Sequence, residues 1–301
     1  MKIKTSPGRK IFVVCNYTFI TLVTITCLLP LINMLAVSFS SSAYAESGIV
    51  SLWPRGFTWA PYTYVMKNEK FWTAFLVTFK RLLLGVPLNV LLATLMAYPL
   101  SKPVTTFPAR RIYMWFFLFT MIFNGGLVPT YLLVKGLGLI DSIWALVLPM
   151  SLNVFHAVIL MNFFRGIPVE IEESALLDGA GHGRIMLQLF IPLAMPSIAT
   201  ITLFSFMIHW NAWMDGRIYM NFTQHYPLQT YLQTVISGAD NIMLSSITGQ
   251  SNLQSMAEML AVSGRNLRAS QIFISIVPVL MFYPYLQKFF TTGLVMGAVK
   301  G

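Results

Sequence analysis

Six apolar runs alternate with polar segments along the chain, and this pattern constrains the fold more than any other feature. The runs cover residues 11–37, 71–100, 112–134, 142–164, 193–213 and 271–290. A helix needs about 20 predominantly apolar residues to cross the hydrocarbon core of a bilayer, so each run has the length of a span. Charged residues make up only 10% of the chain, whereas soluble domains carry about 25%. The sequence therefore predicts an all-α polytopic membrane protein with six transmembrane helices.

The basic residues predict how these spans are oriented. The net charge of +10 would suggest nucleic acid in a soluble protein, but beside membrane spans Lys and Arg mark the cytoplasmic side. With both termini inside, the cytoplasmic segments carry more Lys and Arg residues than the external ones. We expect a cytoplasmic N-terminus at 1–10, a transmembrane domain at 11–290 and a cytoplasmic tail at 291–301. The run at 11–37 is too long for a signal peptide, so we interpret it as an uncleaved first span.

The segment between the fourth and fifth runs, residues 165–192, combines acidic residues, helix signals and paired glycines. Pro168 suits the first turn of a helix, where three glutamates would meet the positive end of the helix dipole. Gly179 and Gly181 are expected to end this helix in left-handed conformations. A second helix is expected from about Gly183 to Ile191, and Pro192 marks its end or a kink. The pattern predicts a small helix–turn–helix whose apolar ridge fits a groove in another protein.

The same segment resembles a known motif. Glu173-Ser174-Ala175, then Gly179, then Leu189-Phe190-Ile191-Pro192 match the spacing of the EAA loop of ABC importer permeases. Ser174, Leu189 and Ile191 depart from that pattern by small or isosteric changes. The wider chain is similar to the maltose-permease-like class, which takes up carbohydrates, and Asn124-Gly125-Gly126, the tract 283–288 and the ending 297–301 are similar to an oligosaccharide subgroup. The resemblance implies a type I ABC importer permease fold.

The resemblance also implies how the protein is driven. The chain has no Gly-x-x-x-x-Gly-Lys-Ser/Thr loop, so ATP and Mg²⁺ are expected on separate ATPase subunits. The EAA-like loop would couple this ATPase to the membrane helices and produce alternating access. In this interpretation two glutamates meet basic or donor groups on the ATPase, apolar residues fill its groove, and a glycine sets the angle between the short helices. The coupling residues are Ile171, Glu172, Glu173, Ala175, Leu176, Asp178 and Gly179.

Polar residues within the spans are the candidates for a substrate pathway. Lys80-Arg81 is a hypothetical anion-attracting site for acidic oligosaccharides; the interpretation we favour is that the span begins near Leu82 and both side chains snorkel outward. Asn124 belongs to a predicted helix break that lines the pathway or allows close helix packing. The remaining candidates could bind sugar, hydrogen bond between helices or anchor at the interface: Asn153, His156, His209, Asn211 and Trp213.

The sequence therefore favours one permease subunit of a multi-subunit ABC importer for oligosaccharides in a bacterial cell membrane. The expected partners are a homologous permease subunit, two ATPase protomers, an extracytoplasmic solute-binding protein and the lipid bilayer. An ion-coupled carrier is the alternative, although all ten Asp and Glu residues lie in loops or at span edges, which leaves no intramembrane carboxylate for H⁺ or Na⁺. We find no metal-ligand or catalytic constellation and expect no bound cofactor, no enzymatic activity and no nucleic acid.

Overall fold

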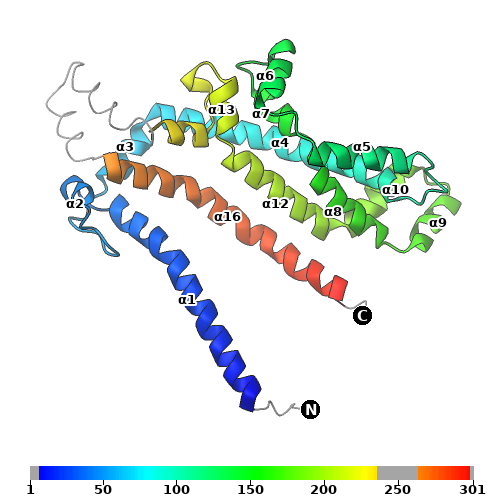
Figure 1. The fold of residues 1–301 in the computed structure, drawn as a ribbon, viewed down its shortest axis with the longest axis horizontal. Helices are drawn as coiled ribbons and strands as arrows, with labels where there is room; N and C mark the ends of the chain where they lie inside the picture. Colours follow the sequence, from blue (N-terminus) through cyan, green and yellow to red (C-terminus); the bar gives the residue numbers. More distant parts are fainter. Residues whose placement is uncertain (1–6, 236–263, 299–301) are drawn as a thin grey trace. The chain divides into compact units, whose positions relative to one another are not determined.

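A computed structural model describes residues 7–235 and 264–298, and every regular element among them is helical. The chain divides into two compact units, formed by residues 1–69 with 234–277 and by residues 70–233 with 278–301. The elements are labelled in Figure 1. The predicted all-α class is confirmed.

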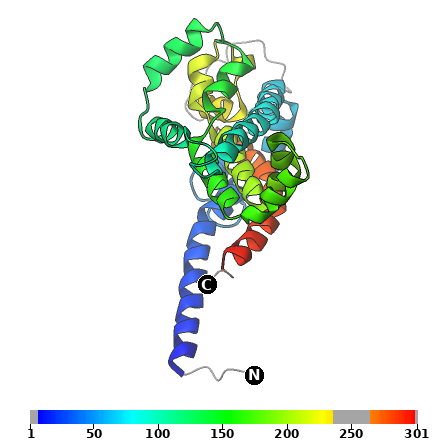
Figure 2. The same ribbon diagram turned by 90° about the vertical axis from the view of Figure 1, so that its right-hand side faces the viewer.

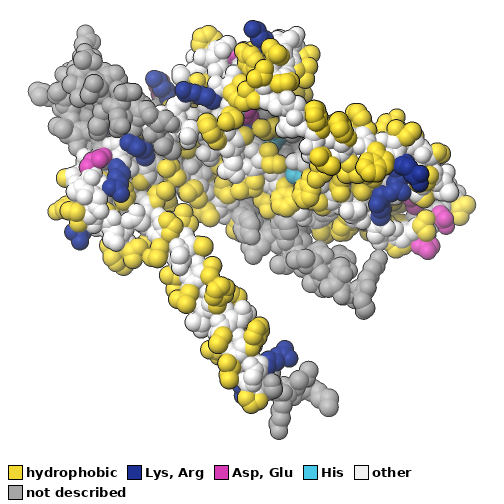
Figure 3. All heavy atoms as spheres, viewed as in Figure 1, with side chains coloured by type: hydrophobic (Ala, Val, Ile, Leu, Met, Phe, Trp, Pro, Cys, Tyr) yellow, Lys and Arg dark blue, Asp and Glu magenta, His cyan; other side chains and the backbone are white. Residues whose placement is uncertain are grey.

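The first unit contains α1 (Pro7–Ser38), α2 (Ser42–Glu46), α3 (Ala60–Lys67) and the start of α16 (Gly264–Ala298). α1 is a continuous 32-residue helix, as the first apolar run predicted, and most of its side chains are exposed. Because exposed Ile, Phe and Leu side chains cover it (Figure 3), lipid or protein must surround it. The start of α16 is tied to this unit where the Asn266 side-chain amide donates to the Ser40 carbonyl at 3.1 Å.

The second unit is built on α4 (Glu69–Ser101), a continuous 33-residue helix. The helix is not divided before Leu82, as it would be if residues 71–79 formed a separate interfacial helix ahead of the span. α4 does not break at Lys80-Arg81 because Arg81 is held inside the protein, as described below. Small residues such as Ala93 and Ala97 let α4 pack against α8 (Val154–Arg165) and α12 (Met195–Asn211) in the main core.

Two of the predicted spans are bent pairs of helices. The third run forms α5 (Arg110–Ile122) and α6 (Leu127–Gly136), which meet at 112°; Figure 2 shows this turn. The break predicted at 124–126 is confirmed: Gly126 has a positive φ of 88°. Close packing through these glycines is not observed, since a Cβ on Gly126 would meet nothing within 4 Å.

The fourth run is bent as well, and a third bend precedes α12 of the fifth run. In the fourth, α7 (Ile143–Val147) and the 3-10 turn η1 (Leu148–Met150) meet α8 at 48°, a bend that the sequence did not predict. Before the fifth, α10 (His182–Ile185), the π-helical turn η2 (Met186–Phe190) and α11 (Ile191–Leu193) meet α12 at 83°. The kink predicted at Pro192 is thus present. By length and apolarity, the described residues provide two single-helix spans and three bent pairs, and α16 covers the sixth run.

The segment at 214–269, which its polar composition predicts to be a long loop, is helical in part. It contains α13 (Met214–Tyr219), the 3-10 turn η3 (Thr223–His225), helical residues 228–235 and the start of α16. The first part of the segment is hydrogen-bonded to the α6–α7 turn: Asp141 N–H donates to the Tyr219 carbonyl at 2.9 Å, and Asn221 N–H donates to Asp141 Oδ1 at 3.1 Å. Residues 236–263 of this prediction lie outside the described residues, as do 1–6 and 299–301 of the predicted termini. α16 continues through the predicted start of the tail at 291.

Candidate functional site

The EAA-like segment folds as a short helix, a turn and a second, irregular helix. α9 (Val169–Leu177) has Pro168 as its N-cap, and Glu170 and Glu172 lie in its first turn. Gly179, with φ of 78°, ends the helix as predicted. The same prediction for Gly181 is wrong: its φ is −75°, and it is the N-cap of α10. A single left-handed residue is sufficient because Ala180 N–H already donates back to the Ala175 carbonyl at 2.9 Å.

α9 presents different residues to the protein and to its surroundings. Ala175 packs against the main core and Ile171 is half-buried. Glu173 and Asp178 are exposed, Leu176 is 45% exposed and Leu177 is 89% exposed. Figure 3 shows acidic side chains gathered at this end of the second unit. Leu177 was not among the predicted coupling residues, although its spacing of four residues from Glu173 places both on one helical face. An exposed pair of leucines beside acids is suited to contact another protein.

Glu172 differs from its neighbours because it points back to its own chain. Its carboxylate lies 2.6 Å from the Lys102 ammonium, directly after the end of α4. Both side chains are largely buried, at 15% and 7% exposure. Burial lowers the pKa of Lys102, and the hydrogen bond and charge of Glu172 oppose that shift. The contact brings the 101–111 segment and the EAA-like loop to the same end of the unit, as the predicted topology requires.

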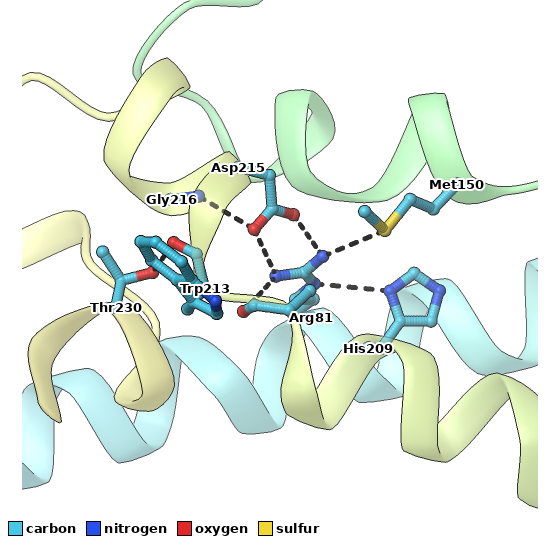
Figure 4. Close-up of polar contacts among 8 residues, drawn as sticks. Arg81, Met150, His209, Trp213, Asp215, Gly216 and Thr230 are labelled. Atoms are coloured by element: carbon cyan, nitrogen blue, oxygen red, sulfur yellow. Dashed lines mark hydrogen bonds and ion pairs between the residues drawn. The ribbon is translucent and has the colours of Figure 1, made fainter. Parts of the chain in front are cut away.

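A second polar cluster lies on the N-terminal half of α4 (Figure 4). Arg81 is completely buried, and both terminal nitrogens of its guanidinium bond to the Asp215 carboxylate in α13. Its Nε donates to His209 Nδ1 at 3.3 Å, and Nη1 donates to the Ala212 carbonyl at 3.4 Å. Arg81 therefore does not snorkel outward. It is neutralised within the chain, whereas the adjacent Lys80 is exposed.

Methionine and asparagine extend this cluster to α8. Arg81 Nη2 lies 3.4 Å from Met150 Sδ, and the Met150 carbonyl accepts from the Asn89 amide at 3.3 Å. Asn89 Oδ1 lies 2.8 Å from His156 Nδ1. Arg81, His156 and His209 were predicted as pathway residues, whereas their partners Asn89, Met150 and Asp215 were not. The missed partners are 61–134 residues from the groups they contact, and no local spacing signals such pairs.

The other pathway candidates lie at or beyond the edge of this cluster, where the Trp213 carbonyl accepts from Thr230 Oγ1 at 2.7 Å (Figure 4). Asn153 is the N-cap of α8 and, with Met150, lines an open cavity of about 560 Å³ whose walls include Phe116, Phe117 and Phe155. Asn124 is exposed, and its side chain accepts from Gly126 N–H at 2.9 Å, a local turn contact. Asn211 and Trp213 are exposed. No group of three or more His, Cys, Asp or Glu residues suited to a metal ion occurs in the part of the chain that the structure describes.

The described helices, with two long apolar helices and three bent pairs, fit a polytopic membrane protein, and the short helix α9 lies between two of the bent pairs. No protein-family model matches the chain. The Bacillus subtilis polygalacturonan/rhamnogalacturonan transport system permease protein YtcP is 34% identical over 97% of this chain and 99% of its own. Protein LplC of the same organism is 35% identical over 99% of this chain and 97% of its own.

Solved structures agree with these relatives. A crystal structure of a bacterial ABC transporter involved in the import of the acidic polysaccharide alginate contains a chain 30% identical to this one, with a TM-score of 0.84, over 96% of this chain and 100% of that one. A bacterial alginate ABC transporter, in complex with an alginate pentasaccharide-bound periplasmic protein, shares the fold at 15% identity and a TM-score of 0.53, over 93% of this chain and 95% of that one. The chain belongs to the permease family of ABC transporters.

Proposed function

We propose that this chain is one of two permease subunits of an ATP-driven importer, and that oligosaccharides are its substrate class. The observation that supports this most directly is the geometry of α9. A short helix outside the membrane spans exposes Glu173, Leu176 and Leu177 while Ala175 anchors it to the core. Such a surface can bind the ATPase that the chain itself lacks. Membership of the ABC permease family excludes the ion-coupled carrier.

The substrate is proposed to be acidic because two similar proteins carry names that refer to acidic polysaccharides. Polygalacturonan and alginate are both polymers of uronic acids, and proteins named for them are 34% and 30% identical to this chain. The buried Arg81 does not supply the selectivity, since Asp215 neutralises it. Exposed Lys80 is the positively charged candidate that remains from the predicted pathway.

The proposed assembly contains a homologous permease subunit, two ATPase protomers that bind ATP and Mg²⁺, and an extracytoplasmic binding protein. Its cytoplasmic side carries both termini and α9. The chain itself binds no cofactor and does no catalysis, and Glu173 and Asp178 of α9 meet donor or basic groups of the ATPase.

Reconstitution of the whole importer in liposomes tests this proposal. We expect ATP-dependent uptake of labelled oligogalacturonate that exceeds uptake of a neutral maltodextrin of equal length. Lys80→Gln should reduce this preference without reducing neutral uptake. Equal uptake of both sugars would contradict the acidic substrate, and import without ATP hydrolysis would contradict the ATP-driven mechanism.

A further inference from the structure

A lysine at the end of α4 occupies an unusual environment. Lys102 directly follows Ser101, the last residue of the helix, and only 6% of it is exposed. Lysines in connecting segments normally keep their ammonium group in water, because burial of a charge is unfavourable unless it is paired. Burial of this ammonium therefore needs compensation from specific neighbours.

Three side chains provide that compensation. The ammonium lies 2.6 Å from Glu172 Oε1, 4.1 Å from the centre of the Tyr98 ring and 4.0 Å from the centre of the Phe190 ring. Both rings are within the range of a cation–π interaction, which strengthens as the cation loses water. The Lys102 ammonium thus contacts three elements: α4 through Tyr98, α9 through Glu172, and the π-helical turn η2 through Phe190.

The aromatic part of this site is itself fixed. Tyr98 and Phe190 meet edge to face at 5.1 Å and 89°, and Phe164 of α8 meets Phe190 at 5.4 Å and 74°. The Tyr98 hydroxyl lies 3.2 Å from His182 Nδ1 at the start of α10. The π-helical turn is the irregular part of the helix after the loop, and such turns often occur at functional sites.

These contacts distinguish Glu172 from the other acids of α9. Glu170 and Glu173 are exposed, whereas Glu172 is half-buried against Lys102. If α9 moved without α4, the buried Lys102 ammonium would lose its charge partner, which is unfavourable. α9, the end of α4 and η2 are therefore expected to move together.

We propose that Lys102 is a positioning residue that transmits displacement of α9 to the membrane helices by holding Glu172, Tyr98 and Phe190 around one charge. This inference rests on the proposed function, because displacement of α9 has a purpose only where a motor subunit binds it. Lys102 contributes to neither the ATPase-binding surface nor the sugar pathway. It determines how much of the movement reaches the helices.

The first test uses the complete importer, reconstituted with its ATPase and binding protein. We expect Lys102→Met and Glu172→Gln to retain the ATPase during purification but to lower sugar uptake per ATP hydrolysed about fivefold or more. The double variant should be no worse than either single variant, and Lys102→Arg should stay within about twofold of wild type. Lys135→Met, which removes an exposed lysine of α6, is the matched control.

A second test does not depend on transport. In a background with Cys15 and Cys27 replaced by serine, spin labels at Ser174→Cys of α9 and Leu91→Cys of α4 report the spacing of the two helices. We expect one narrow distance distribution that broadens when Lys102→Met or Glu172→Gln is added and stays narrow with Lys102→Arg.

The outcomes separate this inference from the proposed function. Unchanged uptake per ATP with a narrow distance distribution in Lys102→Met would overturn the role of Lys102. The role would also be overturned if the Lys102→Met importer lost its ATPase and its ATP hydrolysis and sugar uptake fell in the same proportion. Lys102 would then affect binding of the ATPase and not the transmission of movement. If the wild-type importer moved no sugar, the proposed function would fail, while the distance measurement would still decide whether Lys102 holds α9 to α4.

Discussion

Arg81 and Asp215 form a buried ion pair whose members depend on each other. Asp215→Asn preserves shape but leaves the guanidinium without its charge partner, and removal of one member of such a pair typically costs about 3–5 kcal/mol. We expect a marked fall in the thermal unfolding temperature of the purified protein. Lys80→Gln, at the adjacent exposed position, is the matched control and should change stability by less than about 0.5 kcal/mol.

Simultaneous replacement of both members distinguishes charge from packing. Arg81→Met with Asp215→Leu removes both charges and retains apolar volume, which is often close to neutral for a buried pair. The double variant should therefore be more stable than Asp215→Asn alone. If Asp215→Asn unfolded at the wild-type temperature, the pair would be exposed to water and our description of the cluster would be wrong.

Gly85 permits the close approach of His209 to α4. A Cβ at this position would lie 2.6 Å from two atoms of the His209 ring, which is buried and bonded to Arg81. We expect Gly85→Ala to lower the free energy of unfolding by about 1–3 kcal/mol, because the ring cannot move without disturbing the ion pair.

Gly136→Ala in α6 is the control, since a Cβ there meets nothing within 4 Å. Helix propensity alone favours alanine over glycine, so this variant should be neutral or slightly stabilised. Thermal unfolding of both variants, side by side, makes the comparison. Equal stability of the two would show that the ring has space to move.

At the scale of elements, the turn after α9 depends on a single glycine. Gly179 has φ of 78°, a conformation that costs an alanine roughly 1–2 kcal/mol. Gly179→Ala should alter the turn between α9 and α10. We expect uptake to fall about 5- to 30-fold where this strain opposes the transport-competent conformation, since 1.4 kcal/mol corresponds to a factor of ten. Gly181→Ala, two residues away with φ of −75° and an open Cβ position, should remain within about twofold.

Protein abundance in the membrane must be measured alongside uptake in this pair. If both alanine variants transported equally at equal abundance, the angle set by Gly179 would not matter to the cycle. If Gly181→Ala were the weaker transporter, a contact with a partner at that glycine would be the better explanation.

Local sequence signals predicted some of these elements and missed others. Apolar runs located the membrane helices, and Gly126, Gly179 and Pro192 correctly marked a break, a helix end and a kink. These residues act through their own backbone geometry, which is why one sequence suffices to interpret them. The bend before α8 was missed because Pro149 belongs to an uninterrupted apolar run, and the elements inside 214–269 were missed because the first part of that segment is hydrogen-bonded to the distant Asp141.

The sequence predicted only those features of the candidate site that depend on residues close together along the chain. The EAA-like spacing located α9, but it could not show that Glu172 faces Lys102, 70 residues earlier in the chain. Likewise, Lys80 and Arg81 are adjacent and chemically alike, yet one is exposed and the other buried. Helical periodicity around position 80 does not distinguish them, because the distinction depends on Asp215 in a distant element.

At the scale of the whole molecule, the structure constrains the membrane topology. The contact between Lys102 and Glu172 requires the 101–111 segment and the 165–192 loop to lie on the same side of the bilayer. An even number of crossings must separate them, which agrees with the two bent pairs at 110–136 and 143–165. Which side this is follows from the distribution of Lys and Arg, and we predict the cytoplasm.

Accessibility of single cysteines in intact cells tests this topology. Cys15 and Cys27 are replaced by serine, and Ser47→Cys, Thr105→Cys and Glu173→Cys are introduced singly. A membrane-impermeant maleimide should label position 47 in intact cells, and positions 105 and 173 only after permeabilisation, because a charged reagent cannot cross the hydrocarbon core. If positions 105 and 173 were labelled from opposite sides of the membrane, the Lys102–Glu172 contact could not form. Labelling of both from outside would leave the contact intact but remove α9 from the compartment that supplies ATP, and the proposed coupling with it.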